Sequence, residues 1–311
     1  MANFYVGVDV GGTTVKMGLF SEEGELLEKW EIPTRTEESG VNILPDIVKS
    51  IESKRQEKGG HISGIGMGVP GPVTDDGVVL KCANLGWGVV SAKNEVSSLT
   101  GVGNVAIAND ANIAALGEMW KGGGRGFNSI VMVTLGTGVG GGIIIRGKIL
   151  TGSMGAGGEI GHLKVNPQET ESCNCGGKGC LEQYTSATGI VRIAKKHLHP
   201  GGAKLEDSCL AGVEITAKAI FDGAKSGDTY CEEVVEEFGR YLGYGLANVA
   251  QVVDPEAFVI GGGVSRAGEI ILDVTKRYYN DHVMFALQNK EFRLAELGND
   301  AGIYGAVKMV I

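Results

Sequence analysis

The sequence predicts an α/β protein built from two similar halves. The first observation is a weak internal repeat, because residues 6–20 and 130–145 each read as an apolar strand, a turn rich in glycine and threonine, and a second apolar strand. The second is that other apolar runs typical of strands alternate with segments of helical spacing. The third is an excess of glycine, 52 residues without a period of three, that clusters in part in turns after predicted strands. A cleft between two such halves is a natural ligand site.

Taken in chain order, the elements divide at residue 108. The first half, residues 1–108, is predicted to hold strands over 4–10, 15–20, 62–69 and 104–108, and a helix over 42–58 with isoleucines every fourth residue. The second half, residues 109–298, is predicted to hold helices over 111–120, 182–197, 214–224, 228–253 and 267–283, with strands over 129–135, 143–145, 257–260 and 292–294. The C-terminal helix, within 299–311, is expected to pack back on the first half.

Composition excludes several classes of protein. The chain has a net charge of −9, which disfavours a nucleic-acid partner. No apolar stretch approaches the ~18 residues of a membrane span, and the N-terminus does not read as a signal peptide. Six cysteines in a cytoplasmic chain argue against a disulfide framework. Three of them, Cys82, Cys209 and Cys231, stand apart in the sequence and are interpreted as buried small hydrophobic residues.

Three glycine-rich turns, each after an apolar strand, suggest a triphosphate site. In the first, residues 9–14, Gly11 and Gly12 expose backbone N–H groups while Thr13 and Thr14 add hydroxyl donors. Asp9 could hold Mg²⁺ through water, and Lys16 could reach a phosphate or face solvent. Taken alone, this turn is equally well explained as a tight hairpin closed by an Asp9 side-chain bond. The second turn contains Thr137 and Gly138, and the third is Gly261, Gly262 and Gly263.

The second turn also matches the dinucleotide fingerprint G-x-G-x-x-G at residues 136, 138 and 141. We reject that interpretation because the fingerprint must open a helix, whereas the isoleucines at 143–145 favour a strand. Residues 142–149 resemble a Walker A loop, but Ile149 stands where Ser or Thr must reach Mg²⁺.

Asn109 and Asp110 lie between a predicted strand and a predicted helix. From spacing alone, the favoured role of Asp110 is that of a helix N-cap. The alternative is a general base that accepts the proton of a substrate hydroxyl during phosphoryl transfer. The three phosphate turns make the two interpretations competitive.

His162, Cys173, Cys175 and Cys180 predict a structural zinc site in a glycine-rich loop. Four nitrogen and sulfur ligands suit tetrahedral Zn²⁺ and leave no open position. The alternatives are unrelated loop cysteines or a disulfide. Glu159 and Glu182 flank this loop, so zinc would fix two carboxylates that could accept sugar hydroxyls; otherwise both are solvent-facing acids. Asn84 and Asn109 could add amide hydrogen bonds.

At this point the motifs resemble those of the ROK family of kinases and repressors over nearly the whole chain. The shared segments are Asp9-Val-Gly-Gly-Thr13, Gly68-Val-Pro-Gly-Pro72, Asn84-Leu-Gly-Trp87, Asn109-Asp-Ala-Asn112, Leu135-Gly-Thr-Gly-Val-Gly-Gly-Gly142, Glu159-Ile-Gly-His162, residues 173–182 and Gly261-Gly-Gly-Val264. One departure is the spacing of eleven between His162 and Cys173, which is one residue longer than the family pattern.

The resemblance implies an actin-like ATPase (RNase H-like) fold, a homodimer and Mg²⁺-ATP-dependent phosphorylation of glucose on its C6 hydroxyl, the first step of glycolysis. It implies Asp110 as general base and His162 as a residue that serves both sugar and zinc. The implied sugar contacts are Gly71, Asn84, Asn109, Asp110, Glu159, His162 and Glu182. The implied phosphate contacts are Gly11, Gly12, Thr13, Thr14, Thr137 and Gly138, with adenosine near residues 261–263.

Other functions are weighed against this one. Within kinases, the substrate could be N-acetylmannosamine, fructose or another hexose, or the donor could be polyphosphate. A sugar-sensing repressor would need a DNA-binding helix-turn-helix ahead of the phosphate hairpin, which begins at residue 4. A non-catalytic sugar-binding module is disfavoured by Asp110 and the three glycine turns.

Overall fold

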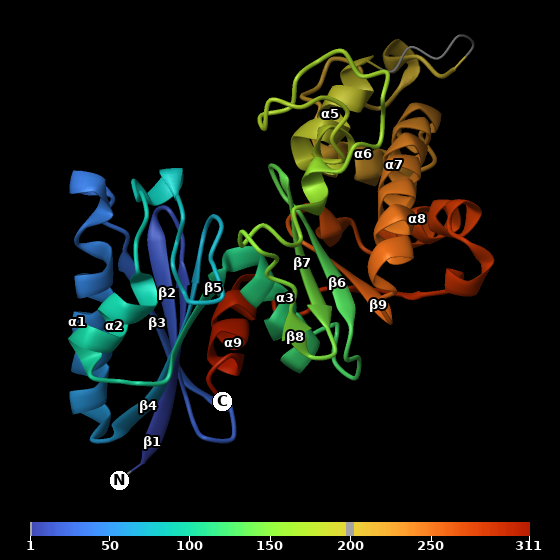
Figure 1. Ribbon diagram of the computed structural model, residues 1–311. Coiled ribbons are helices and arrows are strands. Elements are labelled where there is room, and N and C mark those ends of the chain that lie inside the picture. Colours follow the sequence, from blue (N-terminus) through green and yellow to red (C-terminus); the bar gives the residue numbers. More distant parts are fainter. Residues whose placement is uncertain (1, 197–201) are drawn as a thin grey trace. The chain divides into compact units, whose positions relative to one another are not determined.

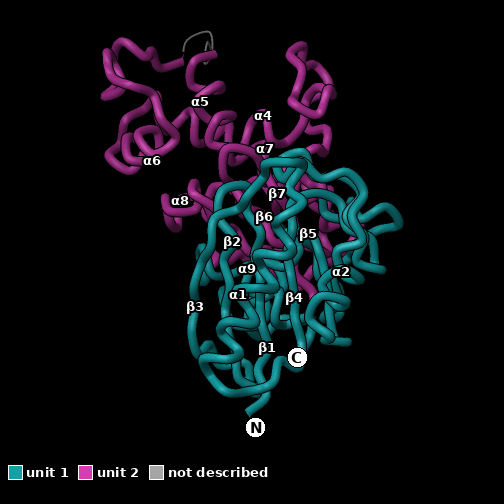
Figure 2. Tube along the Cα trace, turned by 90° about the vertical axis from the view of Figure 1, so that its left-hand side faces the viewer, with its two compact units in different colours: residues 1–128, 142–158, 297–311 teal, residues 129–141, 159–296 magenta. Residues whose placement is uncertain are grey.

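The computed structural model describes residues 2–196 and 202–311, which form two compact units (Figures 1 and 2). Unit 1 comprises residues 1–128, 142–158 and 297–311, and unit 2 comprises residues 129–141 and 159–296. This division differs from a single boundary at residue 108. Helix α3 (Asp110–Lys121) and the end of strand β7 (Val139–Ile145) belong with unit 1, because Gly142 packs against the backbone of α3 at Ala111.

Unit 1 is built on a five-stranded sheet with the order β3-β2-β1-β4-β5. Its strands are β1 (Asn3–Val10), β2 (Thr14–Phe20), β3 (Leu26–Pro33), β4 (His61–Val69) and β5 (Val105–Asn109). Strands β1 and β2 form the expected antiparallel hairpin, whereas β1, β4 and β5 run parallel. Strand β3 was not predicted, because its alternation of half-buried and exposed residues includes Glu28, Lys29 and Glu31.

Helices cover the sheet of unit 1 (Figure 1). Helix α1 (Ile43–Lys58) agrees with the prediction and buries Ile43, Ile47 and Ile51, whereas α2 (Ala92–Thr100) was not predicted. Helix α9 (Ala301–Lys308) packs on β1 and β4 so closely that glycines are needed on both sides of the contact. A Cβ at Gly66 would lie 1.7 Å from the carbonyl oxygen of Ala306.

Unit 2 holds most of a second sheet, whose order is β10-β9-β6-β7-β8. Its strands are β6 (Ile130–Leu135), β7, β9 (Ala257–Gly261) and β10 (Glu291–Leu294), and the two-residue β8 (Lys148–Ile149) pairs with the end of β7 in unit 1. Its helices are α4 (Glu182–Thr185), α5 (Ala187–Lys196), α6 (Ala217–Lys225), α7 (Thr229–Val253) and α8 (Glu269–His282). The two sheets with their helices confirm the α/β prediction.

Three helix predictions in unit 2 need correction. The segment 182–197 is two helices that meet at Ser186, whose hydroxyl donates to the carbonyl of Glu182, and residue 197 lies outside the described residues. The helix expected over 214–224 begins at residue 217, because the Thr216 hydroxyl accepts from the N–H of Ala219 as an N-cap. The helix expected over 267–283 begins at 269, after Gly268 at φ 82°.

Candidate functional site

In unit 1, three parallel strands bring their carboxyl ends together, which is where open α/β sheets bind ligands. Asp9 pairs in register with Gly68 of β4, and Val69 pairs with Asn109 of β5. The sequence motifs that end these strands therefore meet at one edge of the sheet. The side chain of Asn109 continues the connection, because its Nδ2 donates to the carbonyl of Gly71 at 3.1 Å.

Asp9 is a half-buried carboxylate with a perturbed pKa. Burial raises its pKa from 3.8 to about 6; Lys16 opposes the rise and the neighbouring Asp110 adds to it. Lys16 lies directly across the hairpin from Asp9, so its charge faces this carboxylate. Gly302 of α9 closes over Asp9, because a Cβ there would lie 2.5 Å from Oδ2.

Asp110 is not the N-cap of α3, which corrects the interpretation that spacing alone favoured. Asn109 is the cap: its Oδ1 accepts from the N–H groups of Ala111 at 2.9 Å and Asn112 at 3.3 Å. Asp110 is the first residue of the helix, and its Oδ1 accepts from the N–H of Ala111 at 2.8 Å. Asn109 thus takes the capping role, and the carboxylate of Asp110 lies in the first turn, at the positive end of the helix.

The first glycine turn is tied to β3. The N–H of Gly11 donates to the carbonyl of Thr14 at 3.0 Å, and the Thr34 hydroxyl donates to the carbonyl of Gly11 at 2.7 Å. The N–H of Thr34 donates to the carbonyl of Thr13 at 2.9 Å. These bonds hold the turn through its backbone carbonyls, and Gly12 is exposed.

Gly71 and Asn84 belong to the same end of unit 1. Gly71 has φ 93°, and a Cβ there would lie 2.5 Å from the carbonyl of Lys81. Asn84 lies in a 3-10 turn (Ala83–Leu85), and its backbone oxygen is 3.8 Å from the Cβ position of Gly12. Unit 1 thus gathers Asp9, Gly11, Gly12, Gly71, Asn84, Asn109 and Asp110.

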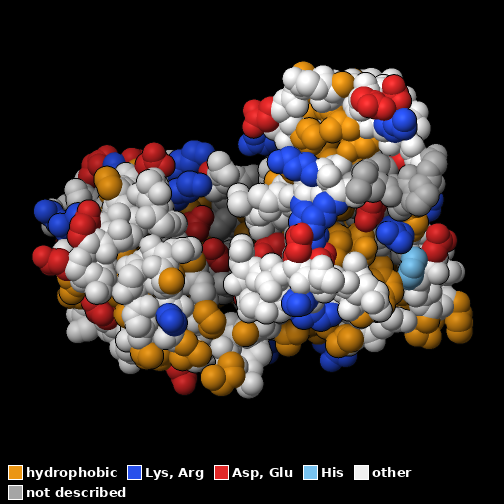
Figure 3. Space-filling view, turned by 90° about the horizontal axis from the view of Figure 1, so that it is seen from above, with side chains coloured by type: hydrophobic (Ala, Val, Ile, Leu, Met, Phe, Trp, Pro, Cys, Tyr) orange, Lys and Arg blue, Asp and Glu red, His pale blue; other side chains and the backbone are white. Residues whose placement is uncertain are grey.

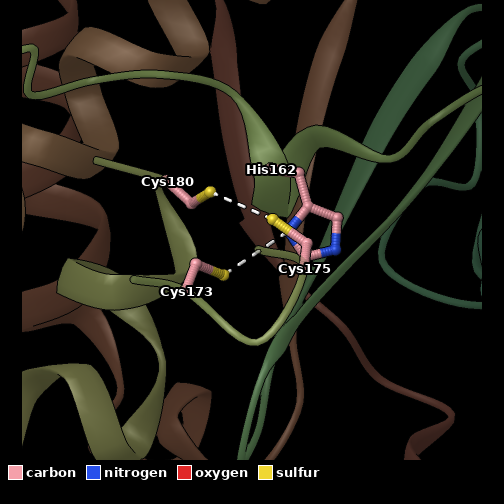
Figure 4. Close-up of side chains that lie close together, drawn as sticks. All are labelled: His162, Cys173, Cys175 and Cys180. Carbon is pink, nitrogen blue, oxygen red and sulfur yellow. Dashed lines mark hydrogen bonds between the residues drawn. The ribbon is translucent and has the colours of Figure 1, made fainter. Parts of the chain in front are cut away.

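In unit 2, His162, Cys173, Cys175 and Cys180 point toward one another (Figure 4). Their four ligand atoms lie within 4.8 Å of each other, with Cys175 Sγ 3.6 Å from Cys180 Sγ and Cys173 Sγ 3.9 Å from His162 Nδ1. Tetrahedral zinc, with bonds of about 2.0–2.3 Å, places its ligand atoms about 3.5–3.8 Å apart. The cluster fits zinc in both donor type and spacing.

The loop around this cluster is shaped by short-range bonds. The N–H of Cys173 donates to the carbonyl of Gly177 at 2.7 Å, and Gly179, at φ 70°, lies against the backbone of Asn166. The backbone N–H of Gly177 lowers the pKa of Cys175, whereas burial raises that of Cys173. Lys164, which the sequence did not single out, donates to Cys180 Sγ at 2.8 Å.

Glu169 anchors the segment between His162 and Cys173. Its carboxylate accepts from the Tyr184 hydroxyl at 2.6 Å and from Arg192. Burial would raise the pKa of Glu169, but these bonds and the N–H of Glu171 outweigh it and lower the pKa to about 2.

Glu182 connects the zinc loop to the second glycine turn. Its Oε2 accepts from the N–H of Val139 at 2.9 Å, and its Oε1 lies 3.6 Å from Cys173 Sγ. Gly138 is required by this contact, because a Cβ there would lie 2.3 Å from Oε2. After this turn the chain enters β7, which confirms that the dinucleotide fingerprint is coincidental. Glu159 precedes the 3-10 turn that holds His162 (Ile160–His162).

A pocket of about 600 Å³ in unit 2 joins the second and third glycine turns. Gly262, at φ 86°, lies against the backbone of Leu135, which leaves Gly263 on the pocket wall. Helix α6 supplies wall residues that the sequence analysis missed, because no turn motif marks them. The lining includes Thr137, Thr216, Lys218, Phe221, Gly263 and Arg266.

Acidic and basic side chains are interspersed on the face drawn in Figure 3, so that face carries no broad basic surface. Among the described residues, no helix combines the length and apolar character of a membrane span.

Comparison with known proteins extends the resemblance to the whole chain. Residues 5–311 match the ROK family. The chain is 43% identical to a glucokinase of Halalkalibacterium halodurans, covering 97% of this chain and 93% of that protein. Its fold is similar to a ROK hexokinase of Thermus thermophilus, with 31% identity, a TM-score of 0.81 and coverage of 99% and 97%. It is also similar to a ROK family glucokinase of Streptomyces griseus in complex with glucose and AMPPNP, with 34% identity, a TM-score of 0.71 and 99% of each chain covered. The expected actin-like ATPase fold is thereby confirmed, and the chain belongs to the ROK family.

Proposed function

We propose that this chain is an ATP-dependent glucokinase that phosphorylates the C6 hydroxyl of glucose. The observation that carries the proposal is the arrangement at the end of β5, where Asn109 caps α3 and Asp110 lies beside the half-buried Asp9. The relatives called glucokinase support the choice of substrate.

In the proposed reaction, the oxygen of the C6 hydroxyl attacks the γ-phosphorus of ATP, and Asp110 accepts the proton of that hydroxyl. The bond between that phosphorus and the β–γ bridging oxygen breaks, and ADP leaves. Asn109 holds Asp110 in place through the cap and through its bond to Gly71. Gly71 and Asn84 supply further sugar contacts.

Asp9 is assigned to the Mg²⁺ ion, which would neutralise phosphate charge during transfer. Burial and the neighbouring Asp110 both disfavour the ionised form of Asp9. A bound cation would offset this cost with its positive charge, so the site fits a cation. Gly11, Gly12, Thr13 and Thr14 are assigned to the phosphates, with Lys16 positioned to balance the charge of Asp9.

In unit 2, the zinc cluster is assigned a structural role: four protein ligands would contribute folding energy to the loop. Because Cys173 faces His162 Nδ1, the other ring nitrogen of His162 is left to hydrogen-bond sugar. Glu159 and Glu182 are the proposed acceptors for sugar hydroxyls. The pocket lined by Thr137 and Gly263 is proposed for the nucleotide, with Gly138, Gly261 and Gly262 shaping its turns.

Zinc thiolates require a reducing compartment, so we place the enzyme in the cytosol. The family resemblance supports a homodimer, which light scattering in solution would test.

The deciding experiment measures ADP release with glucose, mannose, N-acetylmannosamine and fructose, each with ATP or polyphosphate as donor and Mg²⁺ present. We expect kcat/KM with glucose and ATP to exceed every other combination by about tenfold or more. A preference for N-acetylmannosamine or fructose would contradict the assignment of glucose, and no turnover with any sugar would contradict the kinase itself.

A further inference from the structure

Two cysteines that stand apart in the sequence lie together in unit 2. Cys209 and Cys231 were interpreted as unrelated buried hydrophobic residues, and for Cys209 this is wrong because its side chain is exposed. Cys231 is fully buried. Their Sγ atoms and a carboxylate oxygen of Asp228 all lie within 4.8 Å of one another. Cys82, by contrast, is buried as predicted.

Asp228 fixes the backbones that carry both thiols. Its Oδ1 accepts from the N–H of Cys231 at 2.9 Å as the N-cap of α7, and its Oδ2 accepts from the N–H of Cys209 at 2.6 Å. The Ser208 hydroxyl donates to Oδ1 at 3.0 Å. Because both oxygens of this carboxylate are already engaged, the cluster offers two thiols rather than a complete set of metal ligands.

Gly223 of α6 makes the approach of the two sulfurs possible. A Cβ at this position would lie 2.5 Å from Cys231 Sγ and 2.9 Å from Cys209 Sγ. Gly223 has no positive φ that would require glycine. Glycine inside a helix is less favourable than alanine by roughly 1 kcal/mol, so its presence here is explained by the space the sulfurs occupy.

We propose that Cys209 and Cys231 are a redox-active thiol pair that a hydroperoxide converts to a disulfide. The exposed Cys209, as thiolate, attacks the O–O bond and becomes a sulfenic acid, while the departing oxygen takes a proton from solvent and leaves as water or an alcohol. Cys231 Sγ then attacks the Cys209 sulfur, the S–S bond forms, and the sulfenic hydroxyl leaves as water with the Cys231 proton. The product is a neutral group, which suits a buried position beside the Asp228 carboxylate. A dithiol reductant reverses the change.

The pair is connected to the proposed nucleotide pocket through α6. Phe221 lines that pocket, and Gly223 follows it by two residues on the same helix. The carbonyl of Gly223 also accepts from the N–H groups of Ser226 and Asp228, which links α6 to the start of α7. Closing the S–S bond draws Cys209 and Cys231 together across Gly223 and displaces this helix. We therefore expect oxidation to raise the KM for ATP, an effect that rests on the proposed function.

The test treats wild-type enzyme, Cys209→Ser and Gly223→Ala with hydrogen peroxide, then maps disulfides by non-reducing peptide mass spectrometry. We expect a peptide pair joined through Cys209 and Cys231 in the wild type, reversed by dithiothreitol, absent in Cys209→Ser and strongly reduced in Gly223→Ala. This readout does not depend on catalysis. Absence of the linked peptides in the wild type would overturn the pair.

The kinetic arm compares the KM for ATP before and after oxidation, with zinc release measured in parallel. We expect a rise of about threefold or more in the wild type and none in Cys209→Ser, with no zinc released. An unchanged KM in linked protein would overturn the coupling. A KM change in Cys209→Ser that follows zinc loss would assign the effect to the zinc cysteines. Metal analysis of purified protein that finds a second equivalent, lost in Cys209→Ser, would overturn the redox assignment.

Discussion

At the scale of single residues, the division of labour between Asn109 and Asp110 is the most informative local feature. Both are short polar residues after a strand, and either could cap α3. The structure gives the cap to the amide, which satisfies the N–H groups of Ala111 and Asn112. The carboxylate of Asp110 stands one residue further on, in the first turn of α3, where we propose that it meets the substrate.

Replacing Asp110 by asparagine tests the proposed base. We expect Asp110→Asn to lower kcat by about 10³-fold, the usual contribution of a positioned base, while the dissociation constant for glucose changes little. Steady-state ADP release and calorimetric glucose binding would measure both. Asp76→Asn, which removes an exposed carboxylate from the same unit, is the control and should behave as wild type. Near-normal kcat in Asp110→Asn would refute the role.

The raised pKa of Asp9 predicts how stability depends on pH. Because the pKa in the folded state, about 6, exceeds the ordinary 3.8, folding favours the protonated form. This contribution is fully present below pH 3.8 and is lost as pH rises through about 6. Without Mg²⁺, we therefore expect Asp9→Asn to increase the free energy of unfolding by about 2 kcal/mol near pH 8 and by much less near pH 4.

Urea unfolding of wild-type and Asp9→Asn protein at the two pH values would measure this difference. Added Mg²⁺ should stabilise the wild type near neutral pH and have little effect on the variant. A difference between the proteins that is the same at both pH values would contradict a titrating Asp9.

At the scale of elements, the zinc loop is held from two sides. Cysteines 173–180 converge with His162, and Glu169 anchors the preceding segment to Tyr184 and Arg192. Glu182 then links this loop to the second glycine turn, because its carboxylate accepts a hydrogen bond from the N–H of Val139. We therefore expect loss of the metal cluster to weaken sugar binding and to lower the stability of the protein.

Cys175→Ser is the matched test, with Cys209→Ser as control, since both cysteines are exposed and only the first belongs to the zinc cluster. We expect Cys175→Ser to lose zinc, to fall in stability by about 3 kcal/mol and to bind glucose more weakly. Zinc content, thermal unfolding and calorimetry measure the three effects. Unchanged melting and glucose affinity would refute a structural zinc that supports the sugar site.

How much the sequence could predict varied with the kind of signal. Strands β1, β5 and β9 were predicted because buried parallel strands are continuous apolar runs. Strand β3 was not predicted because its edge position tolerates charged residues. The helix expected from residue 214 begins only at residue 217, because the N-cap at Thr216 was not recognised in the sequence. The four candidate zinc ligands were marked by their residue types. The proximity of Cys209 and Cys231 was not predicted, because it depends on tertiary packing across Gly223.

At the scale of the whole molecule, the two ends of the chain belong to one unit. Helix α9 packs on β1, β4 and α3, and glycine permits backbone contact in each case, at Gly7, Gly66 and Gly117. The first unit therefore cannot complete its core until residues 297–311 are in place. Such long-range closure slows folding, because the chain pays loop entropy before these contacts form.

The last prediction concerns this closure. A Cβ at Gly305 would lie 1.6 Å from the carbonyl oxygen of Ile113, so Gly305→Ala must push α9 away from α3. We expect Gly305→Ala to lower the free energy of unfolding by about 3 kcal/mol, whereas Gly103→Ala, with open space at its Cβ position, should cost almost nothing.

The chain's three tryptophans, Trp30, Trp87 and Trp120, all belong to unit 1, and Trp120 contacts Tyr304 of α9 edge to face. Tryptophan fluorescence during urea unfolding thus reports unit 1, while zinc release reports unit 2. The tryptophan midpoint should fall in Gly305→Ala and the zinc midpoint should move less, because the clash lies inside unit 1. Equal midpoints for the two alanine variants would show that α9 docks without the close contact described here.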